Sequence, residues 1–336
     1  MDIKYFNPYS NENFLGFFYQ LGLRLYGFIS GQIPLRELAS DEIQLIVLMS
    51  LAGSAALVGA FLVLRKMTML ANSLSHTILL GIVAAYVMSS NGILEGDEHY
   101  HPINIQAMLW AALGVGILTV FLTEFLTKKA RLQEDASTGI VFTSLFALGI
   151  VLVTLLTRNA HVGTEVVMGN VDALQLEDCK LILIIFGLNI LLTGLFFKEY
   201  QITTFDPALA NALGFSTLFY NYLLMVQVSA TTVGAFRAVG VLMVLAFITG
   251  PVLTARLLTH RLGTLIFMAI GIGFFASLIG VALSRHILSV YGVPFSTSGI
   301  VVCVIAGLFL LAIIWKKIER SRLFGKFQAK DLVSTS

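Results

Sequence analysis

The sequence is short of charged residues and of cysteine. Asp, Glu, Lys and Arg make up 12% of its 336 residues, about half the share found in a typical soluble protein, whereas hydrophobic residues make up 57%. Cys179 and Cys303 lie far apart and neither belongs to a Cys-x-x-Cys pair, so we expect no thiolate zinc site or disulfide framework. A soluble fold of this length could not bury so much apolar surface, but lipid can solvate the outside of a helical bundle.

Several sequence motifs are also missing. There is no Gly-x-x-x-x-Gly-Lys-Ser/Thr phosphate loop, so ATP hydrolysis by that route is not expected of this chain. There is no His-Glu-x-x-His and no Gly-x-Ser-x-Gly, which leaves a membrane protease or hydrolase without support. The first ten residues lack the ordered regions of a removable signal peptide, and a net charge of +2 does not suggest a nucleic-acid partner.

Long hydrophobic runs predict the fold class. A helix needs about 20 apolar residues to cross the hydrocarbon core of a bilayer. Such runs lie at 43–64, 73–90, 105–126, 136–157, 180–197, 218–234, 237–256, 264–284 and 299–315. We therefore predict an all-α, polytopic transmembrane helix bundle with about nine spans, in which 218–234 and 237–256 are either two spans or one bent segment.

The N-terminal segment allows two interpretations. Residues 14–33 are apolar but contain Gln20, Arg24 and several glycines. They form either a tenth span or, as we favour, an amphipathic helix on the outer surface of the membrane. The chain is thus divided into an N-terminal segment (1–42), a transmembrane domain (43–316) and a cytoplasmic basic tail (317–336).

Basic residues predict the orientation of the spans. Lys and Arg gather after the first, third, fifth, seventh and ninth runs, which places those connections and the C-terminus in the cytoplasm of a bacterial cell. The residues concerned are Arg65, Lys66, Lys128, Lys129, Arg131, Lys198, Arg256, Arg261, Lys316, Lys317, Arg320, Arg322, Lys326 and Lys330. We therefore expect a multi-pass protein of the cytoplasmic (inner) membrane.

The first run carries interleaved pairs of small residues four positions apart, including Ser50 with Ser54 and Ala55 with Gly59. Small residues let helix backbones approach closely inside a membrane. We expect this stripe to serve packing within the chain rather than a dimer interface.

The second run opens with polar residues that suit a metal path. Asn72 and His76 are four residues apart and share a helix face, and Ser75 lies beside them. Amide oxygen and imidazole are both ligands for divalent metals, and polar residues inside membranes usually face a pathway. From spacing alone, we favour the alternative that these three side chains hydrogen-bond to neighbouring helices.

Three motifs resemble those of the permeases of metal-type ATP-binding cassette importers, which take up manganese, zinc or iron. They are Arg65-Lys66-Met67 with Ser75-His76 and Gly81; Val239-Gly240-Val241-Leu242-Met243 with Gly250-Pro251-Val252-Leu253-Thr254-Ala255-Arg256; and Gly280-Val281-Ala282-Leu283-Ser284 with Gly292 and Pro294. The resemblance covers roughly residues 43–316. In that family an aspartate usually stands where this chain has Asn72, so a charged carboxylate is missing from that position.

The resemblance implies a transport subunit rather than an enzyme. Two copies, or one copy and a related permease, would form the pathway in the lipid bilayer. Separate cytoplasmic ATPase subunits would drive it by alternating access, and a soluble metal-binding protein would deliver a divalent metal outside. The metal is cargo, so no permanently bound cofactor is expected.

A short segment between the fifth and sixth runs reads as a capped helix. Asp206 suits an N-cap, Pro207 the first helical position and Gly214 the C-terminal cap. The resemblance makes it the helix that couples to the ATPase; otherwise it is a plain connection. Its residues are Phe205, Asp206, Pro207, Ala208, Leu209, Ala210, Asn211, Ala212, Leu213 and Gly214.

Weaker candidates lie on the outer side. Glu95, Asp97, Glu98, His99 and His101 form an acidic, histidine-containing loop that either collects cations or is simply solvated. His161 and Glu165 are lesser candidates for the metal path. Arg237 and Arg285 are expected to act as surface anchors or as a dock for the binding protein, and His260 and His286 are given no role.

Two other transport functions remain open at this stage. An ion-coupled secondary transporter would carry acidic residues inside its spans, and Glu124, near the cytoplasmic end of the third run, is the clearest one. A permease for a chelated metal or siderophore would need a wider cavity.

Overall fold

The computed structural model describes residues 7–10, 12–34, 37–89, 105–157 and 171–334. Within these ranges the chain forms helices and their connections, and no strand. The helices are α1 (Phe14–Ile29), α2 (Ser40–Leu64), α3 (Thr68–Ser89), α4 (Ile105–Lys129), α5 (Glu134–Thr157), the 3-10 turn η2 (Val171–Ala173), α7 (Leu176–Leu195), α8 (Phe197–Phe205), α9 (Pro207–Ala212), α10 (Thr217–Val239), α11 (Val241–Leu258), α12 (Leu262–Tyr291) and α13 (Thr297–Ser334).

Each predicted hydrophobic run coincides with one of these helices apart from up to four residues at its ends, so the predicted all-α membrane bundle is confirmed. In the part of the chain that the structure describes, seven helices are long and apolar enough to cross a membrane: α2, α3, α4, α5, α7, α12 and α13. Helix α11 is a shorter apolar helix. Helix α10 is more polar, because it contains four polar residues that are all buried: Gln227, Ser229, Thr231 and Thr232.

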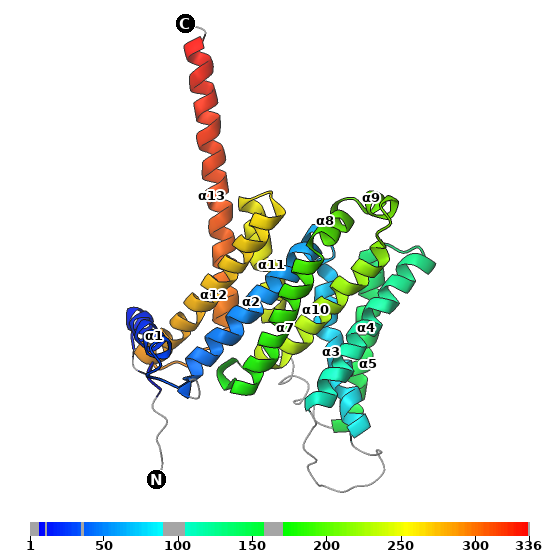
Figure 1. The fold of residues 1–336 in the computed structure, drawn as a ribbon, viewed down its shortest axis with the longest axis horizontal. Helices are drawn as coiled ribbons and strands as arrows, with labels where there is room; N and C mark the ends of the chain where they lie inside the picture. The colour runs from blue at the N-terminus through cyan, green and yellow to red at the C-terminus, as the bar shows by residue number, and fades with distance from the viewer. Residues whose placement is uncertain (1–6, 11, 35–36, 90–104, 158–170, 335–336) are drawn as a thin grey trace.

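Helix α2 is the centre of the bundle. It packs against α7, α10, α11 and α12, and 89% of its most apolar stretch is buried. Helices α3, α4 and α5 form a second group, which contacts the rest mainly through α10 and α11 (Figure 1). Helices α11, α12 and α13 pack together on the other flank of α2.

The small residues of α2 let its neighbours approach, which confirms packing within the chain. A Cβ at Gly59 would lie 2.3 Å from the carbonyl oxygen of Ile248 on α11. On α12, a Cβ at Gly273 would lie 2.9 Å from the Cβ of Ala52. At these two contacts the helices meet almost backbone to backbone.

The sixth and seventh runs are two helices, not one bent segment. Gly240 separates α10 from α11 with φ +80° and ψ 164°, a conformation that strongly favours glycine. The two helices therefore reverse direction at a single residue, and both reach into the core beside α2.

The connections alternate between the two ends of the bundle. Figure 1 shows α9, the turn between α11 and α12, and the C-terminal end of α13 on one side. Helix α1 and the turn between α12 and α13 lie on the opposite side. The basic connections predicted for the cytoplasm thus share one side of the molecule. Helix α13 continues without a break to Ser334, through most of the segment predicted as a tail.

Candidate translocation and coupling sites

His76 sits in the first half of α3, half-buried against α5. Its ring centroid lies 5.4 Å from that of Phe142 and 5.5 Å from that of Phe146, and these two phenyl rings stack on each other. Its Nδ1 atom is buried and has no hydrogen-bond partner in the described structure. An imidazole held by rings but not engaged by a polar neighbour keeps a nitrogen available for another ligand.

Asn72, one turn before His76, is also half-buried on α3. The Ser75 side chain lies outside what the structure describes, as do the loop from Glu95 to His101 and the pair His161 and Glu165. Among the described residues, no group of three or more His, Cys, Asp or Glu side chains comes together. The described chain thus offers two neighbouring positions on α3, not a full metal cage.

Glu124 is placed at the end of α4 that faces the same side as α9. Its carboxylate pairs with Lys128 on the next turn at 2.5 Å, while its Oε2 atom is buried without a hydrogen-bond partner in the described ranges. This i,i+4 ion pair gives a basic partner to Glu124, the clearest acid that would have favoured ion-coupled transport.

The capped helix predicted between the fifth and sixth runs is α9. The backbone N–H of Leu209 donates to Asp206 Oδ1 at 2.9 Å, and Pro207 occupies the first turn. At the other end Gly214 has φ +86°, and the N–H of Phe215 donates to the carbonyl of Ala210 at 2.9 Å. These bonds form a Schellman motif, so both ends of the helix are closed by local sequence.

The outer face of α9 is apolar. Leu209 has 48% of its surface exposed, and it is flanked by Phe205 at the end of α8 (60% exposed) and Leu213 at the C-cap of α9 (56% exposed), whereas Ala210 is buried. Because α9 lies beyond the ends of the spans, this apolar face is not covered by the bundle (Figure 1). A helix with closed ends and an exposed apolar face is suited to contact another protein.

Arg65, at the end of α2, holds α8, the helix that leads into α9, against the core. Its guanidinium donates to the hydroxyls of Thr203 and Thr204 on α8, both at 2.9 Å, and to the side-chain carbonyl of Asn221 on α10. Motif spacing marked Arg65 but did not predict this role, because its partners lie more than 130 residues away in sequence. The end of α2 and the segment leading to α9 are therefore connected by a charged side chain.

Behind this contact, aromatic side chains pack α8 against α2 and α10. The ring of Tyr200 lies 5.2 Å from that of Phe61 and 6.1 Å from that of Tyr220. Its hydroxyl donates to Gln227 on α10 at 2.7 Å, and burial raises the pKa of this phenol. The segment leading to α9 is thus held to the core by packing as well as by hydrogen bonds.

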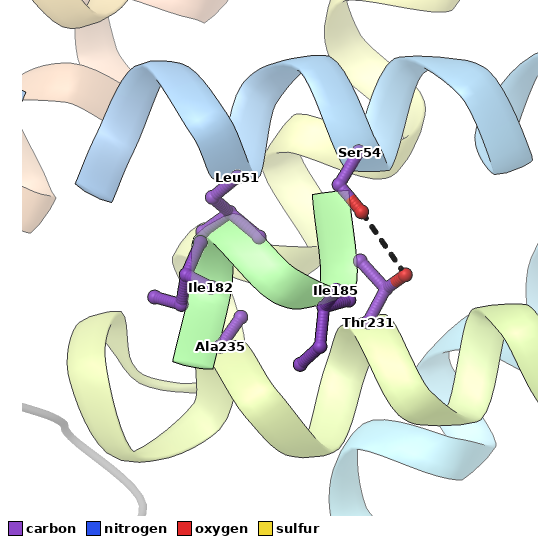
Figure 2. A pocket seen from close by; sticks show the side chains of 6 residues that line it. All are labelled: Leu51, Ser54, Ile182, Ile185, Thr231 and Ala235. Atoms are coloured by element: carbon purple, nitrogen blue, oxygen red, sulfur yellow. Dashed lines mark hydrogen bonds between the residues drawn. The ribbon is translucent and has the colours of Figure 1, made fainter. Parts of the chain in front are cut away.

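A polar cluster joins α2, α7 and α10 inside the bundle. The Asn189 amide donates to the hydroxyls of Ser54 at 2.5 Å and Thr231 at 2.7 Å. Figure 2 shows Ser54 and Thr231 turned toward each other, among Leu51, Ile182, Ile185 and Ala235. The space between these side chains is too small for a water molecule, so the cluster is a joint between helices and not a cavity.

Known proteins resemble this chain over most of its length. The profile of the family described as "ABC 3 transport family" matches residues 42–316. A "Probable metal transport system membrane protein" of Chlamydia trachomatis is 38% identical over 309 residues, which are 92% of this chain and 94% of that protein. The "Manganese transport system membrane protein MntD" of Bacillus subtilis is 35% identical over 266 residues, 73% of this chain and 86% of that protein.

A solved structure agrees with these sequence relatives. PsaBC from Streptococcus pneumoniae in complex with Fab has 26% identity and a TM-score of 0.67, over 86% of this chain and 95% of that one. The apolar helices and their packing define a multi-pass membrane protein of the permease type. The chain belongs to the ABC 3 transport family. The resemblance predicted from the motifs around His76, Pro251 and Gly280 is confirmed.

Proposed function

We propose that this chain is the membrane permease subunit of an ATP-driven importer for a divalent transition metal, manganese, zinc or iron. The membership of the chain in a transport family and the names of its relatives support this function. The observation in the molecule that carries the proposal is His76, whose buried Nδ1 lacks a hydrogen-bond partner in the described structure. Its neighbours on α5 are phenyl rings, which leave that nitrogen for a transient ligand.

A metal that must leave again needs a weak site. Conduction requires binding strong enough to admit an ion and weak enough to release it. Asn72 and His76 supply one neutral oxygen donor and one nitrogen donor on the same face of α3, which fits temporary binding. Ser75, the outer loop from Glu95 to His101, and a second permease copy are proposed as further contributors to the path.

The orientation follows from the basic connections. They share the side of the molecule that carries α9 and the C-terminal end of α13 (Figure 1), and we place that side in the cytoplasm. Helix α9 then faces the separate ATPase subunits, while the soluble metal-binding protein delivers cargo at the opposite end. Arg65 and Tyr200 connect α8, which leads directly into α9, with α2 and α10, so movement of the ATPases would be passed into the core.

Reconstituted uptake tests the transport function. The chain would be purified with its candidate ATPase and binding protein, placed in vesicles, and supplied with manganese, zinc or iron with and without ATP. We expect uptake that requires ATP and is lost in His76→Ala. His260→Ala is the matched control, since His260 is exposed in the connection between α11 and α12 and should transport as wild type. Uptake without ATP would refute the importer, and unchanged uptake in His76→Ala would refute the site alone.

Copurification tests the coupling helix. Leu209→Asp places a charge on the exposed apolar face of α9 without touching its caps, so we expect loss of the bound ATPase. Leu258→Asp is the control, because Leu258 is also an exposed leucine on that side but lies at the end of α11. Equal retention of the ATPase by both variants would show that it docks elsewhere.

A further inference from the structure

The N-terminal segment is fastened to the bundle at the side opposite α9. Helix α1 packs on α12 with an inner face that includes Phe14, Phe17 and Phe18, and the backbone N–H of Phe14 donates to His286 Nδ1 at 3.2 Å. The ring of Phe17 lies 5.0 Å from that of Tyr9, so residues before the helix fold back onto it. The segment is therefore part of the packed structure.

Two buried ion pairs complete the attachment. Asp41 and Glu42, the first acids of α2, are 1% and 5% exposed. Asp41 pairs with Arg285 of α12 and also accepts from the Asn7 amide at 2.7 Å. Glu42 pairs with Arg24 of α1.

Glu42 has two further donors, the Tyr9 hydroxyl at 2.9 Å and the Ala39 backbone N–H at 2.8 Å. Because the buried Glu42 is paired with Arg24 and has further hydrogen bonds, this pair fixes the orientation of α1, while the pair of Asp41 with Arg285 joins the ends of α2 and α12.

That orientation turns an apolar face outward. Leu15, Tyr19, Tyr26 and Ile29 are 80%, 68%, 69% and 79% exposed, and Leu23 and Leu25 are exposed beside them. The one charged residue of α1, Arg24, points to Glu42 instead. A face with two tyrosines, aliphatic side chains and no charge matches the composition of the boundary between lipid headgroups and acyl chains.

The length and position of α1 decide between lying on the membrane and crossing it. Its 16 residues span about 24 Å at 1.5 Å per residue, less than the roughly 30 Å hydrocarbon core. Its contacts are with the beginning of α2 and the end of α12, the level at which those spans leave the hydrocarbon. Helix α12, on which α1 packs, also carries exposed apolar side chains such as Phe275 and Leu288.

We propose that α1 is a membrane-interface helix whose outward face is covered by lipid on the side opposite α9, and that the Arg24–Glu42 ion pair holds it in that orientation, while the Arg285–Asp41 pair joins the ends of α2 and α12 beside it. The partner of this surface is lipid. The proposal depends on the chain being a membrane protein and not on which solute it moves.

Depth-dependent fluorescence quenching tests the proposal. In a background with Cys179→Ala and Cys303→Ser, single cysteines would replace Tyr19 or Ile29 on the outward face, and Phe275 would be replaced as a control in the middle of α12. Gln32, exposed just after α1, provides a water-facing control. The labelled full-length proteins would be reconstituted in phosphatidylcholine vesicles and treated with iodide or with lipids carrying a nitroxide at a shallow or deep position.

We expect labels at positions 19 and 29 to be quenched by the shallow nitroxide and protected from iodide. The label at Gln32 should be open to iodide, and that at Phe275 should respond to the deep nitroxide. Strong iodide quenching at positions 19 and 29 would overturn the lipid assignment, and so would cysteine cross-links there between two copies. Impermeant maleimide reaching Asn13→Cys and Gln32→Cys from opposite sides of the membrane would show that α1 crosses it.

A second set of variants tests the Arg24–Glu42 ion pair. With the label at position 19, Arg24→Gln should reduce shallow-nitroxide quenching, because Glu42 no longer holds the helix in its orientation. Lys198→Gln, which removes an exposed charge from the other side of the bundle, should leave the quenching unchanged. Undiminished quenching in Arg24→Gln would refute the role of the ion pair while keeping the lipid contact.

Discussion

Replacing Gly59 by alanine tests the central position of α2. The added Cβ would stand 2.3 Å from the carbonyl oxygen of Ile248, a backbone atom that cannot turn away. The two helices would have to separate, at a cost near the upper end of the roughly 1–3 kcal/mol typical of overpacking. Alanine restores about 1 kcal/mol of helix propensity, so the net loss of unfolding free energy should be about 2 kcal/mol.

Gly187 on α7 is the matched control. A Cβ there would meet nothing within 4 Å, so Gly187→Ala should gain the helix propensity of about 1 kcal/mol with no clash. The two variants should therefore differ by about 3 kcal/mol, which is more than a hundredfold in the unfolding equilibrium.

The chain contains its own reporter for this measurement. Cys179 is buried in α7, with its Sγ 3.9 Å from the carbonyl oxygen of Ile43 on α2. In a Cys303→Ser background, the temperature at which Cys179 reacts with a thiol-reactive dye reports the loss of this packing. We expect that temperature to fall in Gly59→Ala and to stay or rise in Gly187→Ala. A Gly59→Ala protein as stable as the parent would show that the backbones of α2 and α11 are not in contact.

Three further changes have defined outcomes. Arg65→Met removes the hydrogen bonds to α8 and α10, so the amount of metal taken up per ATP hydrolysed, measured in the same vesicles, should fall. Arg65→Lys should recover only part of this uptake, because one ammonium group cannot reach all three partners. Asp206→Ala removes the N-cap of α9 and about 1 kcal/mol of its stability, which should weaken ATPase copurification; Asp206→Asn should retain it. Burial and the charge of Glu42 raise the pKa of Tyr9, so its contribution to stability is complete below the ordinary tyrosine value of about 10 and is lost as the pH rises above it. Tyr9→Phe should therefore reduce the drop in unfolding temperature between about pH 8 and pH 11, and an equal drop in both proteins would contradict the buried hydrogen bond.

The spans were predictable because an apolar stretch of membrane length has few alternatives. The turn at Gly240 was harder to predict. The hydropathy pattern gives two adjacent apolar runs, and only the backbone conformation shows that the chain reverses between them. The caps of α9 were predictable residue by residue, since Asp206 and Gly214 act on their immediate neighbours.

Contacts between distant segments carried no signal in the sequence. His286 had no assigned role, yet it accepts a hydrogen bond from Phe14, 272 residues earlier in the chain. Arg285 was predicted to be a surface anchor or a dock for the binding protein, and the structure shows its guanidinium paired with the buried Asp41 of α2. The sequence shows that a charged side chain near a span needs an oppositely charged or hydrogen-bonding partner, but only the folded structure shows which residue that partner is.

The burial of α2 has a consequence for biosynthesis. Along the described chain this helix is the first of the long apolar helices, so it is synthesised before the residues that bind Ser54. Its final partners, Asn189 on α7 and Thr231 on α10, are made more than a hundred residues later. The nascent helix must therefore wait, shielded by the insertion machinery or by lipid, until later spans arrive to enclose it. Assembly of the bundle is thus completed around α2, and a chain truncated before α10 would leave Ser54 with Asn189 but without Thr231.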